Sequence, residues 1–149
     1  MRAAKVVLLL AMLWSVPARA EGGPFGLGLI VGQPTGVTGA FELSDHTMID
    51  AAVGFGWVRD RDFYVHVEFD YFLPTLVKGS SAELSAYLGI GGFFFAHKDP
   101  GFGARAPFGL SVDFTSVPLQ IFGEVALLLE LTPDPDLSVR GAIGFRYYF

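Results

Sequence analysis

Three side chains with acid–base or metal-binding chemistry alternate along one short segment of the chain. Single apolar residues separate His66, Glu68 and Asp70, so a β-strand would point all three to the same side. An imidazole beside a carboxylate can transfer a proton, and these groups also bind divalent metals. Positions two apart in a strand are about 7 Å apart, however, which is loose for chelation of one ion. The sequence therefore predicts an interior, hydrogen-bonded histidine here, with no metal and no cofactor.

The other residues that could support catalysis are scattered along the chain. His46 is expected in a turn and His97 in a connection, while Ser111 lies in no nucleophile-elbow motif and has no histidine paired with it in sequence. The glycines of residues 89–92 fall inside an apolar segment, where they are typical of sheet packing and not of a phosphate-binding loop. We therefore expect no enzymatic activity.

Alternation of apolar and polar residues identifies the elements that would position these groups. Apolar residues recur at every second position between turn residues, which is the period of a β-strand. The expected strands are 25–31, 37–43, 47–57, 63–71, 84–94, 106–114, 119–131 and 137–149. Most links between them have the length of hairpin turns, and no helix is available to connect parallel strands. The sequence thus predicts an all-β fold of eight antiparallel strands in up-and-down order.

The composition fits a single apolar domain. Of the 149 residues, 52% are hydrophobic and 17% are charged, with 19 Gly, 15 Phe and no Cys. This length gives one domain a sizeable core but would leave two domains with too little. The absence of Cys excludes disulfides and thiolate zinc sites. The 15 acidic residues outnumber the 10 basic ones, so nucleic acid is not an expected partner.

The first twenty residues have the pattern of a secretory signal peptide. Basic residues Arg2 and Lys5 precede a short apolar run, and Ala18 and Ala20 form a small-x-small cleavage site. The uncharged stretch 6–18 is too short for a membrane-spanning helix. We therefore expect residues 1–20 to be a signal peptide and 21–149 to form the barrel. Cleavage would remove three of the 10 basic residues (Arg2, Lys5 and Arg19), leaving 7 against 15 acidic residues and a net charge of −8.

The character of the two strand faces favours a membrane barrel over a soluble one. In a membrane barrel, apolar side chains face lipid, and polar or small residues fill the interior. The less apolar face carries many Gly and Ala residues, and the only lysines after residue 20 are Lys78 and Lys98, both in connections. Aromatic residues gather near strand ends, as in interfacial girdles: Phe25, Trp57, Phe63, Tyr71, Phe72, Phe94, Phe108, Phe114, Tyr147 and Phe149. The alternative is a secreted sandwich or a soluble periplasmic lipocalin-like binder.

The last strand carries a specific pattern. Ile143, Phe145, Tyr147 and Phe149 place an apolar or aromatic side chain at every second position. This pattern resembles the C-terminal strand signature of bacterial outer-membrane β-barrels, which implies that the barrel assembly machinery reads it as an assembly signal. Residues 21–149 as a whole are similar to eight-stranded barrels of the OmpA/OmpX type, with shorter links than the long outer loops of OmpX-type barrels. More narrowly, residues 117–126 and 144–149 resemble an uncharacterised family of outer-membrane barrels.

Charged residues on the polar strand face would be enclosed in the lumen, where unpaired ions are costly. The main interior charges are Glu68, Asp70, Arg105, Asp113, Glu124, Glu130, Arg140 and Arg146, together with Glu42 and Asp50. Counting along the hairpins predicts one ionic cluster of Asp113, Glu124 and Arg146. A second cluster of Arg105, Glu130 and Arg140 is expected nearer the outside. Together the two clusters would plug the lumen.

These observations predict an outer-membrane barrel with a structural role in the envelope. It would be a monomer that contacts outer-membrane lipid and, during biogenesis, the barrel assembly machinery. A narrow channel for small solutes is the alternative, since acidic residues exceed basic ones in the lumen. A lipid-modifying enzyme and a soluble periplasmic binder are the remaining hypotheses.

Overall fold

The computed structural model describes residues 22–56 and 63–149 as an all-β fold. The strands are β1 (Phe25–Gly32), β2 (Thr35–Ser44), β3 (Thr47–Phe55), β4 (Phe63–Phe72), β5 (Val77–Lys78), β6 (Ala82–Ala96), β7 (Gly101–Phe114), β8 (Leu119–Thr132) and β9 (Asp136–Tyr148). The expected signal peptide, Trp57 and the link 59–62 lie outside the described residues. Within the described ranges, no helix has the length and apolar character needed to span a membrane.

Eight of these strands close into a barrel. The hydrogen-bonded order runs β4-β3-β2-β1-β9-β8-β7-β6, and an additional pairing of β4 with β6 joins the two ends. Every pairing is antiparallel. The predicted fold, an up-and-down antiparallel barrel of eight strands, is therefore confirmed.

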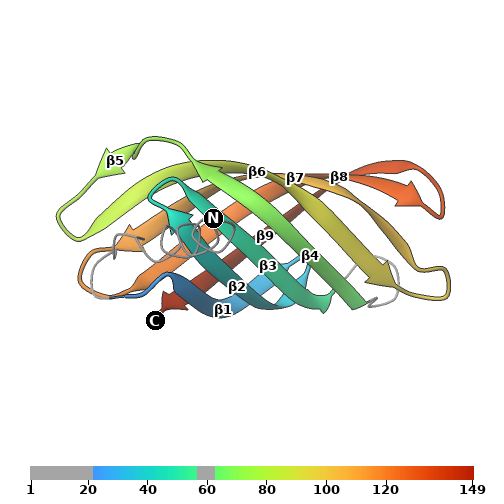
Figure 1. The fold of residues 1–149 in the computed structure, drawn as a ribbon, viewed down its shortest axis with the longest axis horizontal. Coiled ribbons are helices and arrows are strands. Elements are labelled where there is room, and N and C mark those ends of the chain that lie inside the picture. The colour runs from blue at the N-terminus through green and yellow to red at the C-terminus, as the bar shows by residue number, and fades with distance from the viewer. Residues whose placement is uncertain (1–21, 57–62) are drawn as a thin grey trace, which may run out of the picture.

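The two halves of the barrel differ in strand length. Strands β1 to β4 have 8 to 10 residues, whereas β6 to β9 have 13 to 15. The β6–β7 and β8–β9 hairpins extend at one end of the barrel, opposite the end where the C-terminus lies (Figure 1). Strand β7 begins at Gly101, five residues earlier than its alternation predicts. The segment between the expected strands 63–71 and 84–94 contains the short strand β5, which pairs with the first residues of β6.

Apolar side chains cover the outside of the barrel, and charged side chains lie within it. On β4, Val67 and Phe69 are 53% and 46% exposed, whereas Glu68 and Asp70 are 2% and 0% exposed. The same alternation runs along the other long strands. A soluble barrel would have the opposite arrangement, with its apolar face inside.

Most of the described aromatic residues near strand ends point outward, but Phe72 does not. Because successive strand residues face opposite sides, the outward Tyr71 turns Phe72 inward. Phe72 is 5% exposed, and its ring centroid lies 5.3 Å from that of Tyr87. Its assignment to an outer aromatic girdle is therefore wrong. In β9, Ile143, Phe145 and Tyr147 do face outward, being 66%, 45% and 45% exposed.

Candidate functional site

Glycines on the inner wall allow long side chains to reach across a strand. In the register, Glu68 of β4 lies opposite Gly91 of β6, and Gly91 lies opposite Arg105 of β7. A Cβ atom on Gly91 would overlap the backbone oxygen of Val67 and lie 2.6 Å from the Cβ of Glu68, closer than real contacts allow. The absence of a side chain at Gly91 therefore leaves room for Arg105 to bond to Glu68 two strands away.

The same arrangement occurs at two other places in the barrel. Tyr87 of β6 crosses Gly109 of β7, and its hydroxyl donates a hydrogen bond of 2.8 Å to Glu124 Oε2 on β8. Arg146 of β9 crosses Gly28 of β1 to reach Thr38 of β2. Small residues on the inner wall are therefore the reason that the charged groups can meet.

The first buried ionic centre surrounds Arg105. Its Nη1 donates to Glu68 Oε1, and its Nη2 donates to Glu124 Oε1 at 2.5 Å. Arg105 and Glu68 are each 2% exposed, and Glu124 is 5% exposed. This one guanidinium thus links β4, β7 and β8 in a place removed from solvent, where a charge without a partner would be very costly.

The second buried centre surrounds Arg146, which is 1% exposed. Its Nη2 donates to Asp50 Oδ2 on β3, while its Nε and Nη2 donate to Thr38 Oγ1 at 3.0 and 2.8 Å. Its Nη1 donates to Gln120 Oε1 at 3.2 Å. The guanidinium carbon also lies 4.1 Å from the centroid of the Phe122 ring, which is a cation–π contact.

These contacts correct the predicted pairing of Arg146 with Glu124. Glu124 is bonded to Arg105 and Tyr87, and the carboxylate partner of Arg146 is Asp50. The prediction from the C-terminal hairpins did not include Asp50, because its strand, β3, is remote from β9 in sequence. The two strands are connected through β2 and β1 only when the barrel closes. Asp113 does lie at the level of Arg146, but Gln120 lies between them in the strand register. Gln120 Nε2 donates a hydrogen bond of 3.0 Å to Asp113 Oδ1.

The predicted cluster of Arg105, Glu130 and Arg140 is likewise corrected. Since β7 starts at Gly101, Arg105 lies well inside the strand and pairs in register with Gly91, next to Glu68. Glu130 and Arg140 are only half-buried. Arg140 lies 6.0 Å from the ring centroid of Tyr64, which stacks on Phe93 at the same end of the interior.

Carboxylates are crowded between the two arginine centres. Asp50 and Glu68 lie directly opposite each other on β3 and β4, where like charges repel. His66 Nε2 lies 3.4 Å from Glu68 Oε1 and 3.9 Å from Asp50 Oδ1. Asp70 is fully buried, and neither of its carboxylate oxygens has a hydrogen-bond partner. Sequence reasoning placed Asp50 in the interior, but the strand pairing is needed to bring it beside His66.

The remaining candidates for catalysis are not assembled around a nucleophile. Ser111 donates a hydrogen bond of 3.2 Å to Asp113 Oδ2 and not to a histidine. The ring of His46 lies 6.2 Å from that of Tyr71 at a turn. His66 is 2% exposed and faces the lumen, away from any lipid that contacts the outer wall.

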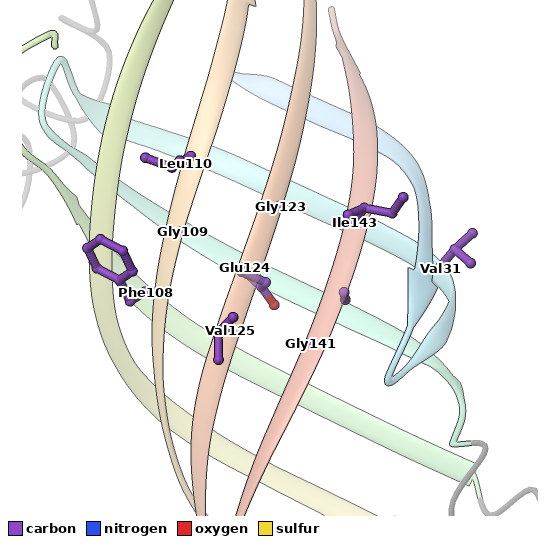
Figure 2. Close-up of a pocket in the computed structure, with 10 residues that line it drawn as sticks. Val31, Phe108, Gly109, Leu110, Gly123, Glu124, Val125, Gly141 and Ile143 are labelled. Atoms are coloured by element: carbon purple, nitrogen blue, oxygen red, sulfur yellow. The ribbon is translucent and has the colours of Figure 1, made fainter.

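An apolar groove of about 550 Å³ lies on the outer wall over β7, β8 and β9. Two glycines on neighbouring strands, Gly123 and Gly141, leave the space open. Figure 2 shows the apolar side chains that surround these two positions: Val31, Phe108, Leu110, Val125 and Ile143. This groove is chemically distinct from the interior, because its open space is bordered by hydrocarbon side chains.

Comparison with known proteins supports the fold. No family model matches the chain, and no curated protein matches it. Among solved structures, the chain is similar to the N-terminal β-barrel domain of Pseudomonas aeruginosa OprF, with 12% sequence identity and a TM-score of 0.57. The likeness covers 85% of this chain and 100% of that one. It agrees with the closed eight-stranded barrel, while the resemblance to an uncharacterised family stays a prediction.

Proposed function

We propose that this chain is an integral outer-membrane β-barrel with a filled interior, which acts as a structural element of the cell envelope. The observation that carries the proposal is the reversal of the two faces. Apolar side chains such as Val67 and Ile143 are more than half exposed, while two arginines and their carboxylate partners are almost completely buried. Such a surface is stable against lipid, whereas in water it would associate.

Several sequence features support the same location. The signal-peptide pattern of residues 1–20 sends a chain across the inner membrane, and we propose cleavage after Ala20. The outward Ile143, Phe145 and Tyr147 offer the assembly machinery the pattern that it reads on the last strand. The barrel would be a monomer whose partners in the membrane are lipids, with an acyl chain filling the groove at Gly123 and Gly141.

The filled interior is inferred from the reach of the two arginines. Arg105 is bonded across β4, β7 and β8, and Arg146 is bonded across β2, β3, β8 and β9. Together these two side chains connect six of the eight strands that close the barrel: β2, β3, β4, β7, β8 and β9. An eight-stranded barrel has an interior just wide enough to be filled by its side chains. We therefore propose a closed, non-catalytic barrel, not a channel.

Conductance across planar lipid bilayers tests this proposal. We expect the wild-type barrel to give no steady openings, because the side chains of Arg105 and Arg146 fill the lumen. A triple variant with Glu68, Arg105 and Glu124 changed to alanine removes one complete centre without leaving an unpaired charge, so it should give openings. Val67→Ala, on the outer face of the same region, is the matched control and should remain closed.

Folding must be checked for every variant in the same experiment. A closed barrel in detergent migrates differently on a gel before and after boiling, and this shift reports that each variant has folded. Steady, cation-selective openings of the wild-type protein would overturn the filled interior and favour the channel. Refolding of the chain in buffer without detergent would overturn the membrane location itself.

A further inference from the structure

We propose that the barrel interior binds one divalent transition-metal ion, of the Zn²⁺ class, through Asp50, His66 and Glu68. One ligand atom from each of these side chains lies within 4.8 Å of the others. Asp50 and Glu68 come from directly paired positions on β3 and β4, and His66 is the next inward residue on β4. The objection that alternate residues of one strand are too far apart is answered by the side chains themselves, because His66 Nε2 and Glu68 Oε1 converge to 3.4 Å. Asp50 of the neighbouring strand supplies the third ligand.

The distances in this group suit a metal centre. Two ligand atoms bound tetrahedrally to Zn²⁺ at its usual bond lengths are roughly 3.4 Å apart. His66 Nε2 lies 3.4 Å from Glu68 Oε1 and 3.9 Å from Asp50 Oδ1, close to this spacing. The ligand atoms of Asp50 and Glu68 lie within 4.8 Å of each other, so binding would draw these two carboxylates together by up to about 1.4 Å. Imidazole together with carboxylate oxygen is a donor set for zinc or manganese, whereas calcium and magnesium prefer oxygen ligands alone.

Unpartnered atoms point to the same ligand. Each arginine engages one oxygen of its carboxylate: Arg146 bonds to Asp50 Oδ2, and Arg105 bonds to Glu68 Oε1. The other oxygens, Asp50 Oδ1 and Glu68 Oε2, are buried without a hydrogen-bond partner. Asp50 Oδ1 is the oxygen that faces His66 Nε2. Asp50 Oδ1 is therefore both unpartnered and close to His66. Glu68 would bind the ion through Oε1, which it shares with Arg105, or by turning its unpartnered Oε2 toward the ion. The arginines would then serve as outer-shell groups that orient the two carboxylates.

The charge balance provides an independent argument. Fully ionised, Asp50, Glu68, Asp70 and Glu124 would carry four negative charges against the two positive charges of Arg105 and Arg146. All six groups are 5% exposed or less, so water does not screen the difference. One divalent cation with a neutral His66 would make this buried set electrically neutral. The competing way to neutralise the set is to bind protons, and the experiment below separates the two.

The test measures zinc bound to the full chain folded in detergent. The protein is folded once with Zn²⁺ and once with a chelator, passed over a desalting column, and analysed for zinc and protein content. We expect one Zn²⁺ per chain after folding with zinc. His66→Gln removes the only nitrogen ligand of the proposed site and should abolish stoichiometric binding. Glu130→Gln, which neutralises a half-buried interior carboxylate outside the proposed site, is the matched control and should keep the ion.

X-ray absorption at the zinc edge decides the outcome if His66→Gln fails to fold. The wild-type protein should then show one imidazole nitrogen with carboxylate oxygens at about 2.0–2.2 Å. A wild-type protein without zinc above the detergent blank would show that protons neutralise the cluster, and it would overturn the proposal. A folded His66→Gln that retains its zinc, or a spectrum without imidazole, would overturn it equally. Conductance is not involved, so failure of this proposal is distinguishable from failure of the filled interior.

Discussion

Arg105 and Arg146 are both buried inside the barrel, yet their surroundings differ. Arg105 is bonded to two carboxylates, Glu68 and Glu124. Arg146 is bonded to one carboxylate, Asp50, and its remaining donors meet the neutral oxygens of Thr38 and Gln120. Its guanidinium plane also lies close to the ring of Phe122.

This difference shows where the negative charge of the interior accumulates. The Arg146 centre is balanced by itself, one cation with one anion. The Arg105 centre has an extra carboxylate. Asp70 is a further buried carboxylate, and it has no hydrogen-bond partner. His66 stands between the two centres, facing both Asp50 and Glu68. The Arg105 centre therefore holds one carboxylate more than its arginine balances, and substitutions at the two arginines should differ in cost.

The largest effect is expected from Arg105→Met. The change leaves Glu68 and Glu124 buried without their cation. The free energy of unfolding should therefore fall by about 5 kcal/mol, the upper end of the range for breaking a buried ion pair. Urea unfolding in lipid vesicles measures this value. Arg140→Met, which removes a half-buried arginine near the end of the barrel, is the control and should cost far less. An equal loss in the two variants would contradict the role given to Arg105.

A smaller loss is expected from Arg146→Met, because only Asp50 loses an ionic partner while Thr38 and Gln120 are neutral. We expect the lower end of the same range, about 3 kcal/mol, in the same unfolding measurement. Adding Asp50→Asn should restore part of the stability, since it removes the orphaned charge. If Arg146→Met proves more destabilising than Arg105→Met, the proposed difference between the two centres is wrong.

An arginine introduced on the outer face of the barrel can be compared with the two buried arginines. Val67 lies between His66 and Glu68 on β4 and faces outward, 53% exposed. In a bilayer, Val67→Arg should cost about 2–4 kcal/mol if the position is near the midplane. Val67→Leu keeps the apolar surface and should be close to neutral. Unchanged stability of Val67→Arg in vesicles would mean that this face does not contact lipid.

The alternation along the chain predicted the eight barrel strands and their antiparallel order, and the small and polar residues of one face predicted which face is enclosed. On β4, the period of two correctly separates Glu68 and Asp70 from Val67 and Phe69. The partners of individual charges could not be predicted the same way. The contact between Arg146 and Asp50 joins residues 96 positions apart, and it depends on ring closure and on the registers of three strand pairs, β9–β1, β1–β2 and β2–β3. Likewise, the true start of β7 at Gly101 is hidden by a glycine-rich sequence with weak alternation.

A double-mutant cycle tests the corrected pairing with a more moderate effect. Combining Arg105→Met with Glu124→Gln should give a coupling energy of about 2 kcal/mol, because the two side chains are in direct contact. The cycle of Arg146→Met with Glu124→Gln should be additive within about 0.5 kcal/mol, as expected for residues without a direct bond. The reverse result would restore the pairing predicted from the hairpins and remove the basis for comparing two separate centres.

A purely steric effect is expected at a glycine, where no charge changes. Gly91 separates Glu68 from Arg105, and a Cβ atom there would lie 2.6 Å from the Cβ of Glu68. Gly91→Ala should therefore push the strands or the carboxylate aside and cost about 1–3 kcal/mol, the usual range for overpacking. Gly39→Ala is the control, since a Cβ at that outward position would meet nothing nearer than the Gly26 carbonyl oxygen at 3.7 Å. Equal stability of the two variants in urea unfolding would show that Arg105 reaches Glu68 without needing the space at Gly91. The arrangement around Arg105 would then depend on charge alone and not on the small residues of the inner wall.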